Sequence, residues 1–430
     1  MILDLNIDSL AFGGSGVGRH DGKVVFVPFT APGDLIRCRI VREKKRFAEG
    51  EILELIEPSS ARREPPCPVF GVCGGCQWQH LPYETQSRWK GEIFADTLRR
   101  QGGGEEELLR PLVRSSEEWN YRSRVQFKCL QTDNGFVMGF YRRGSHFVVD
   151  IENCPITASP LNEALHLFRR WLPQSPCPER IPQVDMAVDD ENKVRIVVHA
   201  LGSDHDALRA FLSPLAESAG FAIFIQTGRK STIIPVVGGE DLHIHPLPGG
   251  SLRLAYGPGG FAQVNLEQNR RLVEGVIAAA DLTGEERVLD LFCGMGNFSL
   301  PLAQKAKEVI GVEDFEPAIE KARDNARENG LSNMSFHART AEGAAGKLAG
   351  GMGLDLVLLD PPRTGAYEVV RDLLSVRPAK IIYVSCDPPT LARDLKPLLH
   401  GGYRLIFSTP FDLFPQTHHT ESLSLLIRQD

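Results

Sequence analysis

Long hydrophobic runs are absent from this sequence. No segment approaches the roughly 18 consecutive apolar residues that a membrane-spanning helix requires. The opening residues, MILDLNID, also lack the basic start and continuous apolar stretch of a secretory signal peptide. We therefore expect a cytoplasmic protein without a membrane partner. No pattern calls for an obligate protein partner, and we expect a monomer.

An excess of positive charge is also lacking. The 430 residues carry 48 Lys and Arg against 55 Asp and Glu, a net charge of −7, which alone argues against a nucleic-acid partner. The basic residues are unevenly placed, however. Six of the twelve residues from Leu35 to Arg46 are Lys or Arg, and basic pairs recur at 99–100, 122 with 124, and 142–143. A solvated strand explains any one group, whereas together they indicate a face that follows the phosphates of a nucleic acid.

Disulfide bonds are rare in the cytosol, so we do not expect the cysteines of this sequence to form a disulfide framework. Three of the nine cysteines, Cys67, Cys73 and Cys76, fall within ten residues whose glycines let the backbone wrap around a ligand. This spacing predicts a metal site, which needs a fourth ligand. The nearby candidates are Cys129, Cys154 and Cys177.

The residues alone leave the metal open. Cys154 precedes a proline, a context common beside iron-sulfur clusters. Four thiolates suit a zinc ion equally well, and zinc is the commoner structural metal. Neither choice leaves an open ligand position, so the site is expected to be structural rather than catalytic.

Composition divides the chain into three parts. Residues 1–58 show short strands with turn residues between them, the pattern of a small β-barrel. A linker-like segment near Ser59 leads into an α+β central domain at 59–255, with a helical pattern at 84–101 and antiparallel strands from Tyr121 to Asp150. Residues 256–430 form the third domain.

The third domain alternates helices and strands, which predicts an α/β fold with a doubly wound, mostly parallel sheet. A helix is expected at 266–280. Strands are expected at 287–292, 308–313, 334–338, 354–359, 380–385, 403–408 and in the final segment SLSLLIR.

Two features of this domain indicate a nucleoside-containing cofactor. The loop from Asp290 to Asn297, DLFCGMGN, follows the first strand, and its glycines permit close approach of a ligand to the backbone. Glu313 ends the next strand, where a carboxylate can bind both ribose hydroxyls. A tight turn without a ligand is the alternative.

Two further strand ends carry reactive groups. Asp360-Pro-Pro-Arg363 follows one strand, and Cys386 follows the next, just before a helix whose N-terminus favours a thiolate. The alternative is that Cys386 is a buried structural cysteine without a chemical role. In a nitrogen-methylating enzyme an aromatic residue would replace Arg363 and stack on the base. A thiolate instead suits carbon chemistry, because its addition to C6 of uracil makes C5 nucleophilic.

Such an adduct is released only when a base removes the C5 proton. Glu421, in the segment FPQTHHTE before the last strand, is a candidate for that base. The alternative is that Glu421 is an ordinary acidic residue on the surface. His418 and His419 could instead bind a metal, but adjacent side chains diverge and no third ligand accompanies them.

Five motifs in order, FAQVN, DLFCGMGNF, DPPRTG, SCDPPTLARDL and HHTES, resemble the RNA uracil-5-methyltransferases of the TrmA and RlmD class. This resemblance implies a Rossmann-like, seven-stranded class I methyltransferase domain that uses S-adenosylmethionine. It implies that Cys386 is the nucleophile and Glu421 the base, and that Asp360 contacts uracil or cofactor. The implied cofactor-binding residues are Gln263, Phe292, Asn297, Glu313, Thr340 and Asp360.

The N-terminal half resembles the members that act on ribosomal RNA. GSGVGR followed by VFVPFTAPGD is similar to a TRAM domain, a small RNA-binding barrel with an OB-like architecture. CPVFGVCGGC with Cys154 is similar to their four-iron cluster, so the resemblance implies a [4Fe-4S] cluster on Cys67, Cys73, Cys76 and Cys154 rather than zinc. The implied substrate is 23S rRNA, with tRNA as the alternative. A non-catalytic RNA-binding or assembly factor on the same fold is the alternative from another class.

Overall fold

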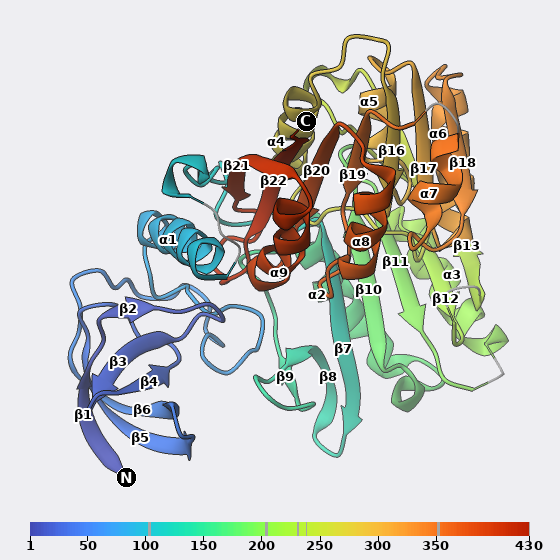
Figure 1. Ribbon diagram of the computed structural model, residues 1–430. Coiled ribbons are helices and arrows are strands. Elements are labelled where there is room, and N and C mark those ends of the chain that lie inside the picture. Colours follow the sequence, from blue (N-terminus) through green and yellow to red (C-terminus); the bar gives the residue numbers. More distant parts are fainter. Residues whose placement is uncertain (102–104, 203–204, 230–231, 238, 351–352, 430) are drawn as a thin grey trace.

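The computed structural model describes the chain except residues 102–104, 203–204, 230–231, 238, 351–352 and 430 (Figure 1). In the described part, no helix has both the length and the apolar character needed to cross a bilayer. The N-terminal strands, shown in blue, form a separate lobe beside a larger body that contains the two seven-stranded sheets.

The N-terminal lobe is a six-stranded sheet that curls into a barrel, as the turn-rich sequence predicts. Its strand order is β1-β5-β6-β4-β3-β2, and β1 also contacts β3. Gly16 and Gly18 on β3 allow the tight curl, because a Cβ at Gly18 would lie 2.3 Å from the Asn6 carbonyl oxygen. The strands are β1 (Ile2–Asn6), β2 (Ser9–Leu10), β3 (Gly16–His20), β4 (Lys23–Val27), β5 (Leu35–Glu43) and β6 (Phe47–Glu57).

The basic strand β5 is less free to meet phosphates than its sequence indicates. Arg37 bonds Asp4 at 2.9 Å and Glu54 at 2.8 Å, and Arg39 bonds Glu51. These carboxylates stand on β1 and β6, the two strands that pair with β5. The prediction missed this neutralisation because cross-strand partners depend on register, which a linear charge pattern does not contain.

The central sheet has the order β13-β12-β11-β10-β7-β8-β9, and the predicted antiparallel strands between Tyr121 and Asp150 form its β7-β8-β9 end. Buried residues of α2 and α3, such as Phe168 and Leu212, pack against apolar side chains of this sheet. The elements are β7 (Arg124–Thr132), β8 (Gly135–Tyr141), β9 (Val148–Asp150), α2 (Ser159–Trp171), β10 (Gln183–Val188), β11 (Val194–His199), α3 (Asp206–Ala219), β12 (Ala222–Gln226) and β13 (Ile233–Val237).

Short elements join the central sheet to the C-terminal domain. A two-stranded hairpin of β14 (Leu242–Ile244) and β15 (Leu254–Tyr256) packs against α6 of that domain. The described 3-10 turns are η1 (Glu106–Leu108), η2 (Leu172–Gln174), η3 (Pro178–Arg180) and η5 (Pro248–Gly250). The expected boundaries near Ser59 and residue 255 stay predictions.

The C-terminal domain confirms the predicted doubly wound fold. Its sheet has the order β18-β17-β16-β19-β20-β22-β21, with only β22 antiparallel to its neighbours. Residues of α4 and α5 pack on one face, and residues of α7, α8 and α9 pack on the other. The strands are β16 (Arg287–Leu291), β17 (Glu308–Glu313), β18 (Met334–Ala338), β19 (Leu356–Leu359), β20 (Lys380–Ser385), β21 (Tyr403–Phe411) and β22 (Glu421–Arg428).

The helices of this domain are α4 (Leu266–Ala280), α5 (Ser299–Ala303), α6 (Glu316–Glu328), α7 (Ala344–Ala349), α8 (Tyr367–Val376) and α9 (Pro388–His400). The expected bounds of α4, β17, β18 and β20 agree with the structure. Strand β21 continues to Phe411 rather than 408, because its pairing with β22 extends to Phe411 opposite Glu421. Pairing across a hairpin is invisible to local periodicity.

Helix α1 (Tyr83–Gln101) ties the N-terminal half of the chain to the C-terminal domain. Its Phe94 and Leu98 are buried in the same core as Leu395 of α9. Lys90 on the same helix is fully buried and bonds Asp412 at 2.7 Å and the Phe414 carbonyl oxygen at 2.9 Å. A buried ion pair therefore anchors the loop that connects β21 to β22.

We expect Lys90→Met to lower the free energy of unfolding by about 3–5 kcal/mol, because it leaves the buried Asp412 charge without its partner. Urea denaturation followed by circular dichroism measures this loss. The double variant Lys90→Met/Asp412→Leu should regain most of the lost stability, and Arg100→Ala on the exposed face of α1 should change it little. A single variant as stable as the wild type would contradict the role of the pair.

Candidate active site

Three of the predicted site loops meet at one edge of the C-terminal sheet. Strands β16, β19 and β20 are parallel neighbours, so the segments that follow them emerge side by side. The glycine loop after β16, Asp360 after β19 and Cys386 after β20 all lie at this edge. The first residue of β22, Glu421, joins them because β22 runs antiparallel beside β20, with Ser422 opposite Ser385.

One cavity of about 750 Å³ brings the catalytic candidates together. Asp360, Arg363, Cys386 and Glu421 all line it. Cys386 is partly exposed, which excludes the reading of a sealed core thiol. The residue after it, Asp387, accepts a hydrogen bond from the Thr390 backbone at 3.0 Å and thereby caps α9.

The environment of Cys386 does not favour the thiolate in the free protein. Burial raises the pKa of the thiol to about 12, and the carboxyl groups of Glu421 and Asp360 raise it further, whereas Arg363 lowers it. The expectation of a readily ionised thiol at a helix N-terminus is therefore wrong. Burial and two neighbouring acids outweigh the helix N-terminus.

The two acids near the thiol are themselves held toward their neutral forms. Burial, followed by the charge of Glu313, raises the pKa of Asp360 to about 7. Burial, followed by the charge of Asp360, also raises the pKa of Glu421 well above its usual value, while Arg363 opposes this rise. Glu421 is only 3% exposed. A carboxyl group with a raised pKa is a stronger proton acceptor once ionised, as a general base must be.

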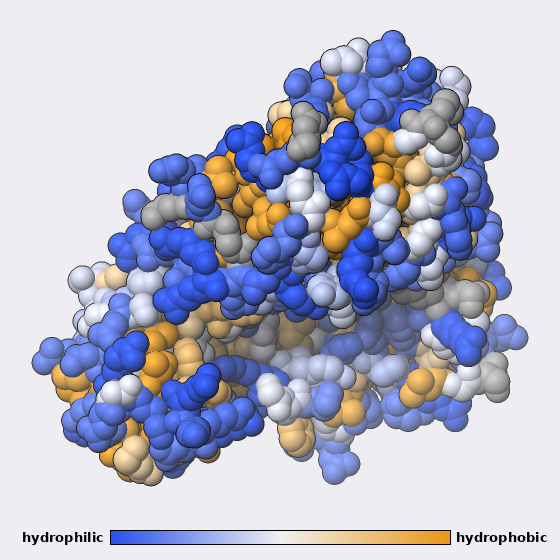
Figure 2. Space-filling model, in the orientation of Figure 1, coloured by the Kyte–Doolittle hydropathy of each residue, from blue (hydrophilic) through white to orange (hydrophobic). Residues whose placement is uncertain are grey.

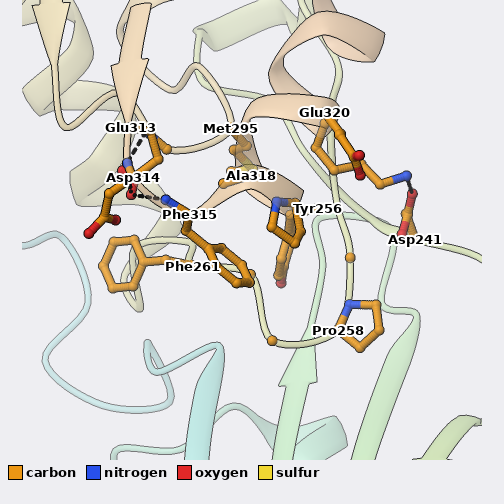
Figure 3. A pocket seen from close by; sticks show the side chains of 16 residues that line it. Asp241, Tyr256, Pro258, Phe261, Met295, Glu313, Asp314, Phe315, Ala318 and Glu320 are labelled. Atoms are coloured by element: carbon orange, nitrogen blue, oxygen red, sulfur yellow. Dashed lines mark hydrogen bonds and ion pairs between the residues drawn. The ribbon is translucent and has the colours of Figure 1, made fainter. Parts of the chain in front are cut away.

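A second cavity, of about 530 Å³, adjoins the first and shares Phe261, Gly294, Glu313 and Asp314 with it. Figure 3 shows Glu313 at the upper left, with Phe261 below it and Tyr256 to the right of Phe261. The Glu313 carboxylate accepts hydrogen bonds from the backbone of Asp314 at 3.0 Å, of Phe315 at 3.1 Å and of Gly294 at 3.3 Å. These bonds hold the acid beside the glycine loop, where a ribose would bind.

The glycine loop is held in an unusual conformation. Phe292 lines the larger cavity with a φ of 67°, a left-handed conformation that is costly for a bulky residue. Gly296 has a φ of 97°, and a Cβ there would lie 2.2 Å from Leu300. Asp290 lies behind the loop, fully buried, and accepts a hydrogen bond from the Ser299 hydroxyl. The bond to Ser299 braces the loop, and burial raises the pKa of Asp290 to about 8.

Most predicted cofactor-contacting residues line the larger cavity, namely Gln263, Phe292, Glu313, Thr340 and Asp360. Asn297 does not line it. Its side-chain amide instead exchanges two hydrogen bonds with Asn269 of α4, at 2.9 and 3.0 Å. A cofactor contact by Asn297 stays a prediction, whereas its pairing with Asn269 joins the glycine loop to α4.

The four cysteines chosen from the sequence lie around a third cavity, of about 260 Å³. It is lined by Cys67, Cys73, Cys76 and Cys154, whereas Cys129 and Cys177 do not line it. Burial, with a contribution from Cys154, raises the pKa of Cys73 to about 11 and that of Cys76 to about 12. Within the described residues, no group of three or more His, Cys, Asp or Glu side chains is arranged to hold a metal ion.

Two aromatic residues at the site escaped the sequence reasoning. Phe261 is 62% exposed and lines both larger cavities, and its place in a glycine-rich loop is the signal that could have revealed it. Phe414 lies between the catalytic cavity and the cysteine cavity and lines both, as do Arg363 and His419. No local pattern marks Phe414, because its position depends on where the loop after β21 folds.

The His418 and His419 side chains are not arranged as metal ligands. Burial lowers the pKa of His418 to about 4 and that of His419 to about 3. His418 Nδ1 lies 3.2 Å from the Gln77 side-chain oxygen, and His419 Nε2 lies 3.5 Å from an Arg363 nitrogen. His418 therefore connects the loop after β21 to residues 67–78, here called the cysteine loop, and His419 connects it to the segment that contains Arg363.

Comparison with known families agrees with this geometry. A model of the tRNA (uracil-5-)-methyltransferase family matches residues 107–429, and a TRAM domain model matches residues 2–53. The chain belongs to the RNA uracil-5-methyltransferase family. Membership confirms the resemblance drawn from the five motifs and, with it, the predicted enzyme class and the N-terminal TRAM domain.

Relatives in the uracil-5-methyltransferase family match over nearly their whole length. A protein of Alkalilimnicola ehrlichii named 23S rRNA (uracil(1939)-C(5))-methyltransferase RlmD is 37% identical, covering 99% of this chain and 96% of its own. The protein of the same name from Shewanella amazonensis is 36% identical, with coverages of 98% and 94%. The crystal structure of Pyrococcus abyssi tRNA (uracil-54, C5)-methyltransferase in complex with S-adenosyl-L-homocysteine superposes with a TM-score of 0.76 at 25% identity, covering 98% and 99% of the chains.

For this uracil-5-methyltransferase we expect alkylation of Cys386 by iodoacetamide to quicken by about tenfold per pH unit between about pH 7 and pH 9. A raised pKa lowers the thiolate fraction at a given pH, and that fraction then grows with pH until the pKa is reached. Arg363→Gln should slow the reaction, because Arg363 lowers the pKa of the thiol. Peptide mass spectrometry separates Cys386 from the other cysteines. A plateau below pH 8 would contradict the raised pKa.

Proposed function

We propose that this protein methylates C5 of a uracil in RNA, with S-adenosylmethionine as the methyl donor and Cys386 as the nucleophile. The observation that carries the proposal is the convergence of Cys386, Asp360 and Glu421 on one cavity that continues into the space beside Glu313. A thiol, an acid that can act as a base and a ribose-binding acid are the three groups that the reaction requires.

The chain's own residues suit the donor. When bound, S-adenosylmethionine supplies an electrophilic methyl group and leaves as S-adenosylhomocysteine. Glu313 offers a carboxylate for ribose hydroxyls, and the Gly294 backbone at the loop lets a ligand approach closely. Gln263, Phe292, Thr340 and Asp360 line the larger cavity, and together with Asn297 they are the other proposed contacts.

The proposed reaction begins with loss of the Cys386 proton. Asp360 lies near enough to influence the thiol and accepts that proton, which leaves the Glu421 carboxylate ionised for the later step, while Arg363 stabilises the thiolate. The thiolate then adds to C6 of uracil, and the C5–C6 π electrons become available at C5. That carbon forms a new bond to the methyl group as the methyl–sulfur bond breaks.

Release of the product requires the C5 proton to leave. Glu421 takes this proton, the electron pair of the C5–H bond restores the C5–C6 double bond, and the Cys386–C6 bond breaks to return the thiolate. Burial supports this role because it raises the pKa of Glu421 well above its usual value. Asp360 is proposed to hold a polar edge of the uracil ring beside the thiol.

We propose 23S rRNA as the substrate. Two relatives that match at full length are named as 23S rRNA uracil-5-methyltransferases. The matched family and the superposed Pyrococcus abyssi enzyme are named for tRNA, which makes tRNA the second candidate. Structured RNA hides its bases, so the target uracil must be turned out of its stack to reach this cavity.

Methyl transfer to RNA tests this proposal. The wild-type protein should transfer labelled methyl groups from S-adenosylmethionine to unmodified 23S rRNA, and Cys386→Ser should reduce the rate by at least about 10³-fold because the nucleophile is lost. Transfer to unmodified tRNA instead would overturn the ribosomal substrate alone. No transfer to any RNA by the wild-type protein would favour the alternative of a non-catalytic RNA-binding or assembly factor.

We further propose that Cys67, Cys73, Cys76 and Cys154 hold a [4Fe-4S] cluster. Their four thiols line a single cavity, and Cys154 is followed by a proline, a context common beside iron-sulfur clusters, which supports a cluster over a zinc ion. Bound as thiolates to iron, the cysteines would lose the protons that burial makes them retain in the free protein. The cluster would brace the loop from Cys67 to Cys76 against the central sheet.

Anaerobically purified protein should contain about four iron atoms per chain and absorb at the blue edge of the visible spectrum. Cys76→Ser should lose the absorbance and most of the iron, because it removes one of the proposed ligands. Cys177→Ser is the matched control and should retain both. A colourless protein with one zinc ion, or full iron content in the Cys76 variant, would contradict the proposed cluster.

A further inference from the structure

The loop between β21 and β22, residues 412–420, carries several groups that face the catalytic cavity. Phe414 and His419 line that cavity, and Glu421 follows the loop directly as the first residue of β22. The way this loop is held therefore determines how the proposed base meets the substrate.

Gln416 is the centre of this loop. It is fully buried, and its φ of 70° places a non-glycine residue in the left-handed region. Such a conformation persists only where the surroundings hold it. The cavity lining does not include Gln416, so the residue does not touch the proposed substrate space.

Every polar group of Gln416 has a partner from a distant part of the chain. Its side-chain oxygen accepts from Arg63 at 2.9 Å and from Gln86 at 2.8 Å, and its amide donates to Glu118 at 3.1 Å. Its backbone N–H donates to the Gln86 side chain at 2.9 Å. Its carbonyl oxygen accepts from the backbone of residues 77 and 78, at 3.1 and 3.0 Å.

These partners come from three segments. Arg63 precedes the cysteine loop, Gln86 lies on α1, and Glu118 lies in the segment that leads to the central sheet. Residue 77 directly follows Cys76. Buried hydrogen bonds that are all satisfied hold a single arrangement, because breaking any one leaves a desolvated polar group. Gln416 thus fixes the loop against all three segments at once.

We propose that Gln416 is a positioning residue that aims Glu421 at the C5 proton and thereby sets the rate of product release. This inference rests on the proposed function. Glu421 is separated from Gln416 by four loop residues, whereas Cys386 and Asp360 follow β20 and β19 in the interior of the sheet. The pairing of β20 with β19 and the Asp387 cap of α9 hold the segment around Cys386 independently of the loop.

The reaction offers a way to measure the positioning of Glu421 separately from the positioning of Cys386. RNA containing 5-fluorouracil carries fluorine at C5, so the adduct forms and is methylated but has no C5 proton to lose. Formation of that adduct reports on Cys386 and the donor. Turnover on ordinary RNA requires, in addition, proton removal by Glu421.

The first variant is Gln416→Gly, which suits the positive φ and deletes only the side-chain bonds. We expect turnover on ordinary RNA to fall by about tenfold or more, and adduct formation with fluorinated RNA to keep its wild-type rate. A denaturation-resistant complex with ordinary RNA should accumulate, because release has become slow. Arg88→Ala, on the exposed face of α1, is the control and should match the wild type in all three measurements.

A charge exchange provides the second variant. Gln416→Glu places a carboxylate against Glu118 and should slow release, whereas Gln416→Glu/Glu118→Gln again pairs one donor with one acceptor and keeps the Arg63 contacts. If the double variant recovers the rate of product release, this supports the proposal that Gln416 positions Glu421. The comparison of these two variants also tests the role of Gln416 if the Gln416→Gly variant fails to fold.

The inference is overturned if turnover and adduct formation fall together in Gln416→Gly and the exchange restores neither, because the residue is then only structural. It is also overturned if Gln416→Gly releases product at the wild-type rate. Absence of both methyl transfer and adduct in the wild-type protein is a different result, which refutes the proposed function itself.

Discussion

The burial of ionisable groups at one edge of a parallel sheet is the constraint on which the rest of this structure depends. Asp360 and Glu421 lie beside Cys386 in one cavity, and burial raises the pKa of all three groups. Removing charges from water is costly, so the fold must hold these groups rigidly for them to stay there. The same cost makes each group a better proton acceptor or nucleophile once it loses its proton.

That rigidity comes from outside the domain that carries the chemistry. The loop before Glu421 is anchored to α1 by the buried ion pair of its Asp412 with Lys90, and to the cysteine loop by the contacts of Gln416. The barrel and the C-terminal domain lie on either side of this junction (Figure 1). Figure 2 shows a largely hydrophilic surface that is hollowed between the C-terminal domain and the central sheet.

Much of the fold could be predicted because its signals are local. The alternation of helices and strands after Asn265 identified the doubly wound sheet, and the parallel order of its strands explains why residues as distant as Gly294 and Cys386 meet. Glu313 and Asp360 could be found from the sequence for the same reason. A strand that ends in a charged residue or a glycine is visible in a single sequence.

The remaining features depend on contacts between distant segments. The pairing of Arg37 with carboxylates follows from strand register, and the raised pKa of Cys386 follows from how deeply its neighbours are buried. Asn297 fits a cofactor motif, yet its amide is bonded to α4. The network around Gln416 joins residues more than 290 positions apart, as with Glu118, which no local pattern records.

The most direct measurement is the location of the covalent bond between protein and RNA. The wild-type protein is incubated with S-adenosylmethionine and RNA containing 5-fluorouracil, digested with nuclease and protease, and examined by tandem mass spectrometry. A methylated fluorouracil nucleotide should be attached to the peptide that contains Cys386. Attachment to any other residue, or methyl transfer to ordinary RNA with no attachment to fluorinated RNA, would contradict a nucleophilic Cys386.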